Sequence, residues 1–157
     1  MRTVIEEFWN LHEEHVSIMK DPSKLGSESH DSLLRLLTHV KNNPECRDAL
    51  AGCFVTLIEG LREVHSSASY GWRVIPFCMR ELRWQEVKDA ITKELQDAVD
   101  PDHHRFLKRI LSAYEPAWED ESAFLYYVEK AEKDGRVLSF DSPKSRRTGR
   151  FLGILKK

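Results

Sequence analysis

Cysteines are few in this chain, and none of them belongs to a metal-binding or redox motif. The 157 residues include three cysteines, Cys46, Cys53 and Cys78, with no CxxC pair. Cys46 and Cys53 are seven residues apart, which places them on one face of a helix. This pattern does not fit a disulfide framework or a structural zinc site. We therefore expect three reduced, buried thiols.

Long apolar runs and the common catalytic motifs are also missing. No apolar stretch approaches the ~18–20 residues of a transmembrane helix. The N-terminal sequence MRTVIEEFWNLHEEH has acids where a signal peptide has a basic start and an apolar run. A glycine-rich phosphate loop, a Walker motif and a GxSxG motif are absent as well. We therefore expect a cytoplasmic protein with no membrane contact and no cofactor.

The charged residues are distributed unevenly along the chain, whose formal net charge is −2. Residues 136–157 contain seven Lys and Arg and one acid, which gives this segment a charge of +6. Residues 1–135 contain 17 bases and 25 acids, which gives them a charge of −8. This asymmetry predicts two parts: a helical domain over residues 1–135, and a basic tail or hairpin over residues 136–157 that packs on it.

Residues 71–99 predict a pair of helices around which we expect the rest of the chain to pack. Pro76 fits the first turn of a short helix over residues 75–82, because proline lacks a backbone N–H. Arg83 and Trp84 then form a corner. A longer helix follows, with apolar residues spaced by three or four along one face: Trp84, Val87, Ile91, Leu95 and Ala98. Trp84 is interpreted as a core anchor, with a recognition role as the alternative.

Helical periodicity continues on both sides of this pair and predicts a mostly all-α fold, an antiparallel bundle of six or seven helices. The further helices are expected over residues 3–19, 31–41, 44–65, 101–115 and 121–134, with Thr3 and Asn43 as N-caps. We expect one core cluster that includes Phe54, Leu57, Trp84, Ile91 and Ile110. Residues 137–140 and 150–155 are β-prone, so the tail is expected to form a short hairpin or to be irregular.

A weak internal repeat occurs at a spacing of 41 residues. Asp48-Ala49-Leu50 matches Asp89-Ala90-Ile91, and both lie near the start of a long helix that follows a corner. Over residues 31–115 the pattern resembles HEAT or armadillo repeats, which implies stacked helix pairs. In size and acidic helical surface the chain also resembles small helical bacterial immunity proteins, which bind a toxin and block it. No motif carries that second resemblance, so it assigns no residues.

The segment after Pro116 predicts a partner-binding surface. A tryptophan surrounded by acids has the composition of an interface anchor with a charged rim; these residues are Glu115, Trp118, Glu119, Asp120 and Glu121. We therefore expect a non-enzymatic protein-binding module, an immunity or inhibitor protein that neutralises a basic toxin such as a nuclease. The alternative interpretation of Trp118 is a side chain packed into the core.

Two other functions remain open. His12, His15, His30 and Asp31 resemble the ligand set of HD-type metal phosphohydrolases, in which His and Asp hold divalent ions that activate water. Asp31 is equally explained as a helix N-cap.

The basic tail is the third candidate, because its side chains could contact phosphates: Lys144, Arg146, Arg147 and Arg150. Only one aromatic, Phe151, follows them, and the acidic body argues against broad nucleic-acid binding.

Overall fold

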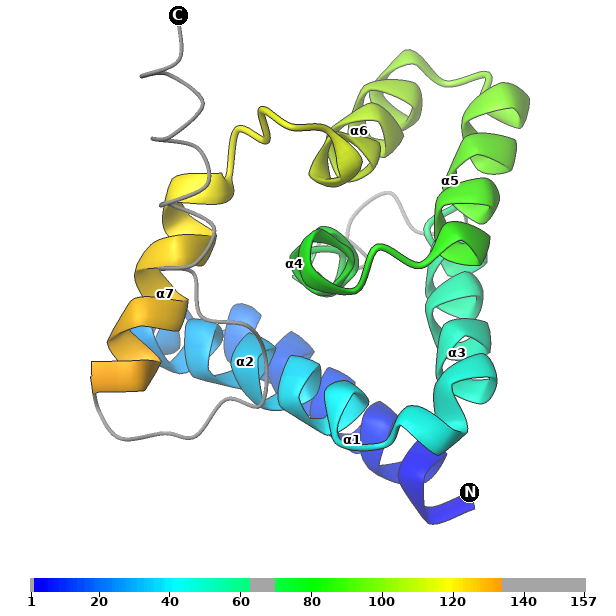
Figure 1. Ribbon diagram of the computed structural model, residues 1–157. Helices are drawn as coiled ribbons and strands as arrows, with labels where there is room; N and C mark the ends of the chain where they lie inside the picture. Colours follow the sequence, from blue (N-terminus) through cyan, green and yellow to red (C-terminus); the bar gives the residue numbers. More distant parts are fainter. Residues whose placement is uncertain (1, 63–69, 134–157) are drawn as a thin grey trace, which may run out of the picture.

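A computed structural model describes residues 2–62 and 70–133, and all the regular secondary structure in these residues is helical (Figure 1). The α-helices are α1 (Arg2–Met19), α2 (Ser27–Lys41), α3 (Arg47–Gly60), α4 (Val74–Leu82), α5 (Gln85–Asp97), α6 (Pro101–Leu111) and α7 (Glu121–Lys133). Short 3₁₀ helices are η1 (Pro22–Lys24), η2 (Pro44–Cys46) and η4 (Ser112–Tyr114). The predicted all-α class is confirmed. The predicted tail hairpin lies outside the described residues.

Helix α4 occupies the centre of the molecule. Figure 1 shows it end-on, with α1 and α2 below it, α3 and α5 on one side, α6 above and α7 on the other side. Every residue from Val74 to Arg80 is buried. The sequence VIPFCM explains this position, because a helix that is apolar on all faces must be covered on all faces. The predicted short helix at residues 75–82 is therefore the element on which the others pack.

The corner between α4 and α5 lies where the sequence predicts it. Arg83 adopts a left-handed backbone conformation with φ of 56°, and its N–H donates to Met79 O, which ends α4. Trp84 is partly buried, and its ring centroid lies 6.0 Å from that of Phe54 on α3. Its carbonyl accepts a hydrogen bond of 2.9 Å from Tyr114 Oη. These contacts agree with the interpretation of Trp84 as a core anchor.

Two helix pairs define the frame around α4. Helices α1 and α2 run antiparallel, because His39 near the end of α2 contacts Val4 O at 2.9 Å while Ser32 contacts His15 at 2.7 Å.

Helices α3 and α5 run parallel. Arg47 binds Glu86 where both helices begin, and Arg62 binds Glu94 near their ends with N–O distances of 2.7 and 3.0 Å. The two helices therefore lie side by side, although α4 comes between them in the sequence. The resemblance to HEAT repeats stays a prediction.

Several helix starts differ from the predicted ones. Helix α2 begins at Ser27, four residues before the predicted start, because Gly26 takes a φ of +104° and Ser29 Oγ bonds to its N–H and carbonyl. Helix α1 already includes Thr3, so Thr3 is not its N-cap. Asn43 does not cap the following helix either, because its side-chain amide donates to His39 O at 2.7 Å.

The core cluster surrounds α4 and contains most of the residues predicted for it. Phe54, Ile91 and Ile110 are completely buried, while Leu57 and Trp84 are partly buried against them. All three cysteines are reduced and buried, as expected. Within residues 2–62 and 70–133, no helix has the length and apolar character needed to span a membrane.

Candidate functional site

Trp118 does not form the exposed anchor that the sequence suggested. Its side chain is 6% exposed, and its ring centroid lies 6.0 Å from that of Phe124. The cause is Arg80 on the buried helix α4, which donates hydrogen bonds to the carbonyls of Glu115 and Pro116. These bonds hold the segment between η4 and α7 against α4, so Trp118 packs into the core. The alternative interpretation of Trp118 is the correct one.

The four acids around Trp118 differ in their surroundings. Glu121 pairs with Arg80. Arg109 on α6 pairs with Glu119 at 3.0 Å and with Asp120 at 3.3 Å. Glu115 and Glu119 are exposed. Because two arginines compensate three of these acids, the corner has less charge for attracting a basic partner than the sequence indicates.

The four residues of the predicted metal site do not assemble into one. His12 and His15 lie on α1, whereas His30 and Asp31 lie inside α2. Among the residues that the structure describes, no three His, Cys, Asp or Glu side chains form a group that could hold a metal ion. Asp31 is also not an N-cap, because α2 begins before it. The HD-type ligand set is therefore not formed by these four residues.

His15 instead forms a buried polar contact between α1 and α2. Its Nδ1 lies 2.7 Å from Ser32 Oγ, and that hydroxyl donates its one hydrogen to Ser29 O at 2.7 Å. Nδ1 must then be the protonated nitrogen that donates to Ser32. Burial, and after it the charges of His12, Arg73 and His30, lower the pKa of His15 to about 4. His15 is thus a neutral residue of the core at physiological pH.

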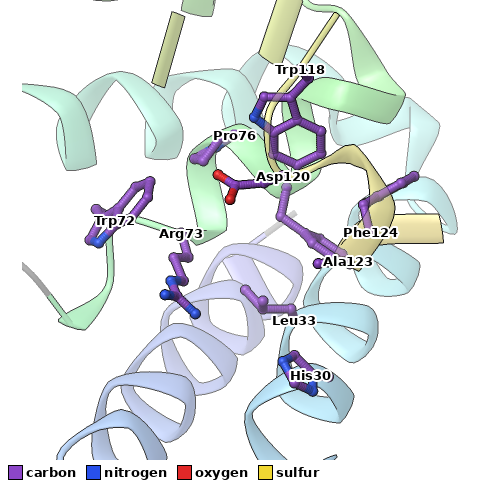
Figure 2. Close-up of a pocket in the computed structure, with 10 residues that line it drawn as sticks. His30, Leu33, Trp72, Arg73, Pro76, Trp118, Asp120, Ala123 and Phe124 are labelled. Carbon is purple, nitrogen blue, oxygen red and sulfur yellow. The ribbon is translucent and has the colours of Figure 1, made fainter. Parts of the chain in front are cut away.

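A cavity of about 210 Å³ opens between α2, the start of α4 and α7 (Figure 2). Aromatic side chains form much of its wall: Trp72, Phe77, Trp118 and Phe124. Three polar side chains also face it: His30 from α2, Arg73 before α4 and Asp120 before α7. A cavity with apolar walls and a few polar groups is the usual form of a ligand site. We define this set as the aromatic cavity.

The two indole rings of the aromatic cavity already contact arginines. The guanidinium carbons of Arg109 and Arg73 lie 5.1 and 5.8 Å from the Trp72 ring centroid. Arg80 lies 5.7 Å from the Trp118 ring centroid. Such cation–π contacts hold the rings in place and leave less of their faces for another cation.

Two polar groups of the cavity are notable for their state. Burial, and next the charge of Arg73, lower the pKa of His30 to about 4, so its imidazole is neutral at pH 7. The indole Nε1–H of Trp118 is buried and has no hydrogen-bond acceptor within the described part of the chain. A buried donor without an acceptor is uncommon in native proteins and calls for a physical explanation.

A second hollow of about 240 Å³ lies on the other side of His30, between the start of α2 and α7. Gly26, Ser27, Tyr126 and Lys130 are among the residues that line it. Tyr126 on α7 is 60% exposed, and Leu25, next to Gly26, is 52% exposed. We call Leu25, Tyr126 and this hollow the α2–α7 surface. No sequence signal indicated this surface, because Leu25 lies in a polar loop and Tyr126 lies outside the apolar positions of its helix.

The remaining candidates from the sequence, Lys144, Arg146, Arg147 and Arg150, lie outside the described residues. No protein-family model, curated protein or solved structure matches this chain.

Proposed function

We propose that this protein is a non-enzymatic protein-binding module that contacts its partner through the α2–α7 surface. One observation carries the proposal. Only three large hydrophobic side chains of the described residues are markedly exposed. One of them, Tyr126, lines the hollow, and a second, Leu25, directly precedes Gly26, which also lines it. Exposed apolar side chains that gather at one place are typical of interaction sites, whereas scattered ones are ordinary.

The composition of the α2–α7 surface supports the same proposal. Tyrosine is enriched among the residues that contribute most to protein–protein binding, and such residues tend to sit in recesses with a polar rim. Here Tyr126 stands at a hollow that Asp31 and Lys130 also line. A partner side chain entering the hollow would be covered by Tyr126 and flanked by both charges.

The finer proposal is an immunity or inhibitor role against a basic partner, such as a toxin nuclease. Its support is the charge of −8 over residues 1–135, which would attract a basic protein at a distance. We assign the contact to the α2–α7 surface rather than to the corner around Trp118, because that tryptophan is buried. Attraction of this kind raises the association rate and weakens with salt.

The test places a photo-crosslinking p-benzoylphenylalanine at position 126 in the cells that make the protein. Position 99 is the matched control, because Val99 is 95% exposed but lies between α5 and α6, away from the hollow. We expect one cross-linked partner of defined mass from position 126 and none from position 99. The identified partner is then titrated with wild type, Tyr126→Ala and Val99→Ala.

Tyr126→Ala is expected to weaken binding at least about tenfold, a typical loss for a central aromatic contact. Val99→Ala is expected to leave the affinity unchanged. Equal cross-linking at both positions, or unchanged affinity of Tyr126→Ala, would remove the α2–α7 surface from consideration. Salt dependence of the association rate, measured with the same partner, tests the charge argument separately.

A further inference from the structure

We propose that the aromatic cavity binds a small organic carboxylate, held by Arg73 and the Nε1–H of Trp118, with its apolar body between the aromatic walls. This site is separate from the α2–α7 surface, and the inference does not depend on the protein-binding function. Figure 2 shows Arg73 and Trp118 on opposite sides of the cavity, with Asp120 between them.

Arg73 supplies the charge that an anion needs. Among the described residues it is the one lysine or arginine that lines the cavity, and it is exposed. Within the part of the chain that the structure describes, Arg73 forms no salt bridge, and its guanidinium carbon lies 5.8 Å from the Trp72 ring centroid. Its planar set of N–H donors fits a carboxylate in a two-pronged arrangement.

Trp118 supplies a second, independent reason to expect an acceptor. The Trp118 side chain is only 6% exposed, and its Nε1–H has no hydrogen-bond acceptor within the described residues. A buried donor without a partner is destabilising by roughly 1–3 kcal/mol. Figure 2 shows the indole nitrogen on the edge of the ring that faces Pro76, at the cavity wall. A ligand oxygen at that edge would satisfy it.

A cationic ligand is disfavoured by the contacts already present. Aromatic walls with an acid can form a cage for ammonium groups. Here, however, guanidinium groups already lie over both indole rings, and Arg109 already holds Asp120 at 3.3 Å. A second cation would have to displace an arginine, whereas an anion finds donors that are available.

The same geometry indicates that the ligand carries a single negative charge and has a small apolar body. Arg109 offsets the charge of Asp120, so Arg73 leaves the described lining of the cavity with about one positive charge, which matches an anion of one charge better than a phosphate of two. The volume of about 210 Å³ is below the ~300–1,000 Å³ of pockets for drug-sized ligands, so the ligand body is about one ring in size. The chemistry is that of a carboxylate on an apolar group, which a free acid or the C-terminus of a peptide can supply.

The experiment titrates 3-phenylpropanoate into ¹⁵N-labelled protein and follows the indole N–H signals of Trp72 and Trp118 by NMR. Two parallel titrations use 3-phenylpropanamide and 3-phenylpropylamine, which keep the ring but lack the negative charge. A further pair of titrations compares the peptide Gly-Gly-Phe with its C-terminal amide, which distinguishes a peptide terminus from a free acid. We expect saturable shifts of both indole signals with at least one of the two carboxylates, and none with the amides or the amine.

Variants connect the binding to the named donors. Arg73→Gln is expected to weaken binding about tenfold or more, the usual loss for a hydrogen bond to a charged group. Trp118→Phe keeps a ring but removes the N–H, and it is expected to weaken binding about threefold to tenfold. Arg105→Gln is the matched control, since Arg105 is exposed on α6 and, among the residues that the structure describes, pairs with Asp102 alone. Thermal melts of each variant verify that it is folded.

Absence of shifts with both carboxylates would overturn the inference. So would equal affinity for the amides or the amine, or unchanged affinity of a folded Arg73→Gln. These results would leave the protein-binding proposal untouched, since its readout is the cross-link at position 126.

Discussion

The guanidinium carbon of Arg80 lies 5.7 Å from the ring centroid of Trp118, although the two residues are far apart in the chain. Arg80 is 3% exposed and lies on the central helix α4. Its hydrogen bonds reach the carbonyls of Ala113, Glu115 and Pro116 and the carboxylate of Glu121. This one side chain positions the segment that carries Trp118, and therefore forms one wall of the aromatic cavity.

Replacing Arg80 with Met is expected to destabilise the fold by about 3–5 kcal/mol, because it removes the buried guanidinium that donates to one carboxylate and three carbonyls. Urea unfolding at pH 7 gives the free energy. Arg83→Met is the matched control, since Arg83 is exposed at the end of the same helix and donates to Tyr114 O at 2.7 Å. The control is expected to cost about 1 kcal/mol or less. Equal losses would show that the contacts of Arg80 add little.

Neighbouring positions on α3 distinguish the predicted core stripe from the observed one. Ile58 is fully buried, whereas Leu57 is partly exposed. Ile58→Ala is therefore expected to cost about 2–5 kcal/mol and Leu57→Ala clearly less. The core cluster predicted from the sequence includes Leu57 and would assign this residue the full cost. Chemical unfolding measures both losses, and a loss for Leu57→Ala as large as that for Ile58→Ala would favour the predicted core.

Gly71 allows the chain before α4 to approach α1. A Cβ at this position would lie 2.7 Å from His12 Nε2 and 3.1 Å from Val16 Cγ2. Gly71→Ala is expected to cost about 1–3 kcal/mol through overpacking. Adding His12→Ala removes the nearest atom, so the double variant should recover part of that loss relative to His12→Ala alone.

Gly52→Ala provides the control for Gly71→Ala. Gly52 is exposed inside α3, and a Cβ there meets nothing within 4 Å. The added methyl group is expected to stabilise the protein by about 0.5–1 kcal/mol through helix propensity. A loss of stability in Gly52→Ala, or no recovery in the double variant, would contradict the conclusion that the room for an added Cβ decides the stability of these variants.

The buried His15 predicts a loss of stability in acid. Its pKa falls from about 6.5 in the unfolded chain to about 4 in the fold. Between these values the unfolded state binds more protons, so stability is complete above pH 6.5 and decreases as the pH falls toward 4. One group with this shift accounts for a loss of up to roughly 3 kcal/mol.

Urea unfolding from pH 7 to pH 4.5 measures this effect as the slope of stability against pH. His15→Gln keeps a donor for Ser32 but cannot be protonated, so its slope should be smaller than that of the wild type. His30→Gln should reduce the slope too, because burial also lowers the pKa of His30 to about 4. Identical slopes for wild type and His15→Gln would show that the imidazole of His15 is protonated without cost.

Local sequence signals determined the helices around the centre of this protein. The predicted starts of α4, α6 and α7 agree with the observed ones within one residue. The signals were Pro76 with the apolar run after it for α4, Asp100-Pro101 for α6 and Glu121 for α7. Asp100 is the N-cap of α6, and Pro101 is its first residue. The Asp100 carboxylate accepts a hydrogen bond of 3.0 Å from the backbone N–H of Asp102. These features act within a few residues, so the sequence alone contains them. The early start of α2 is the exception, because the bonds between Gly26 and Ser29 occur in a polar run that resembles a loop.

The candidate sites depended on contacts between distant segments. Trp118 has the surroundings of a surface anchor in sequence, and only its proximity to Arg80 and Phe124 makes it a core residue. His12, His15 and His30 lie near enough for the charges of His12 and His30 to lower the pKa of His15, yet no three His, Cys, Asp or Glu side chains of the described residues form a group that could hold a metal ion. The aromatic cavity joins residues from α2, α4 and the start of α7. Periodicity in the sequence identifies which face of a helix is apolar. Tertiary packing decides which other helix covers that face, because the contacts join segments that are distant in the chain. The cavities lie where this packing leaves space.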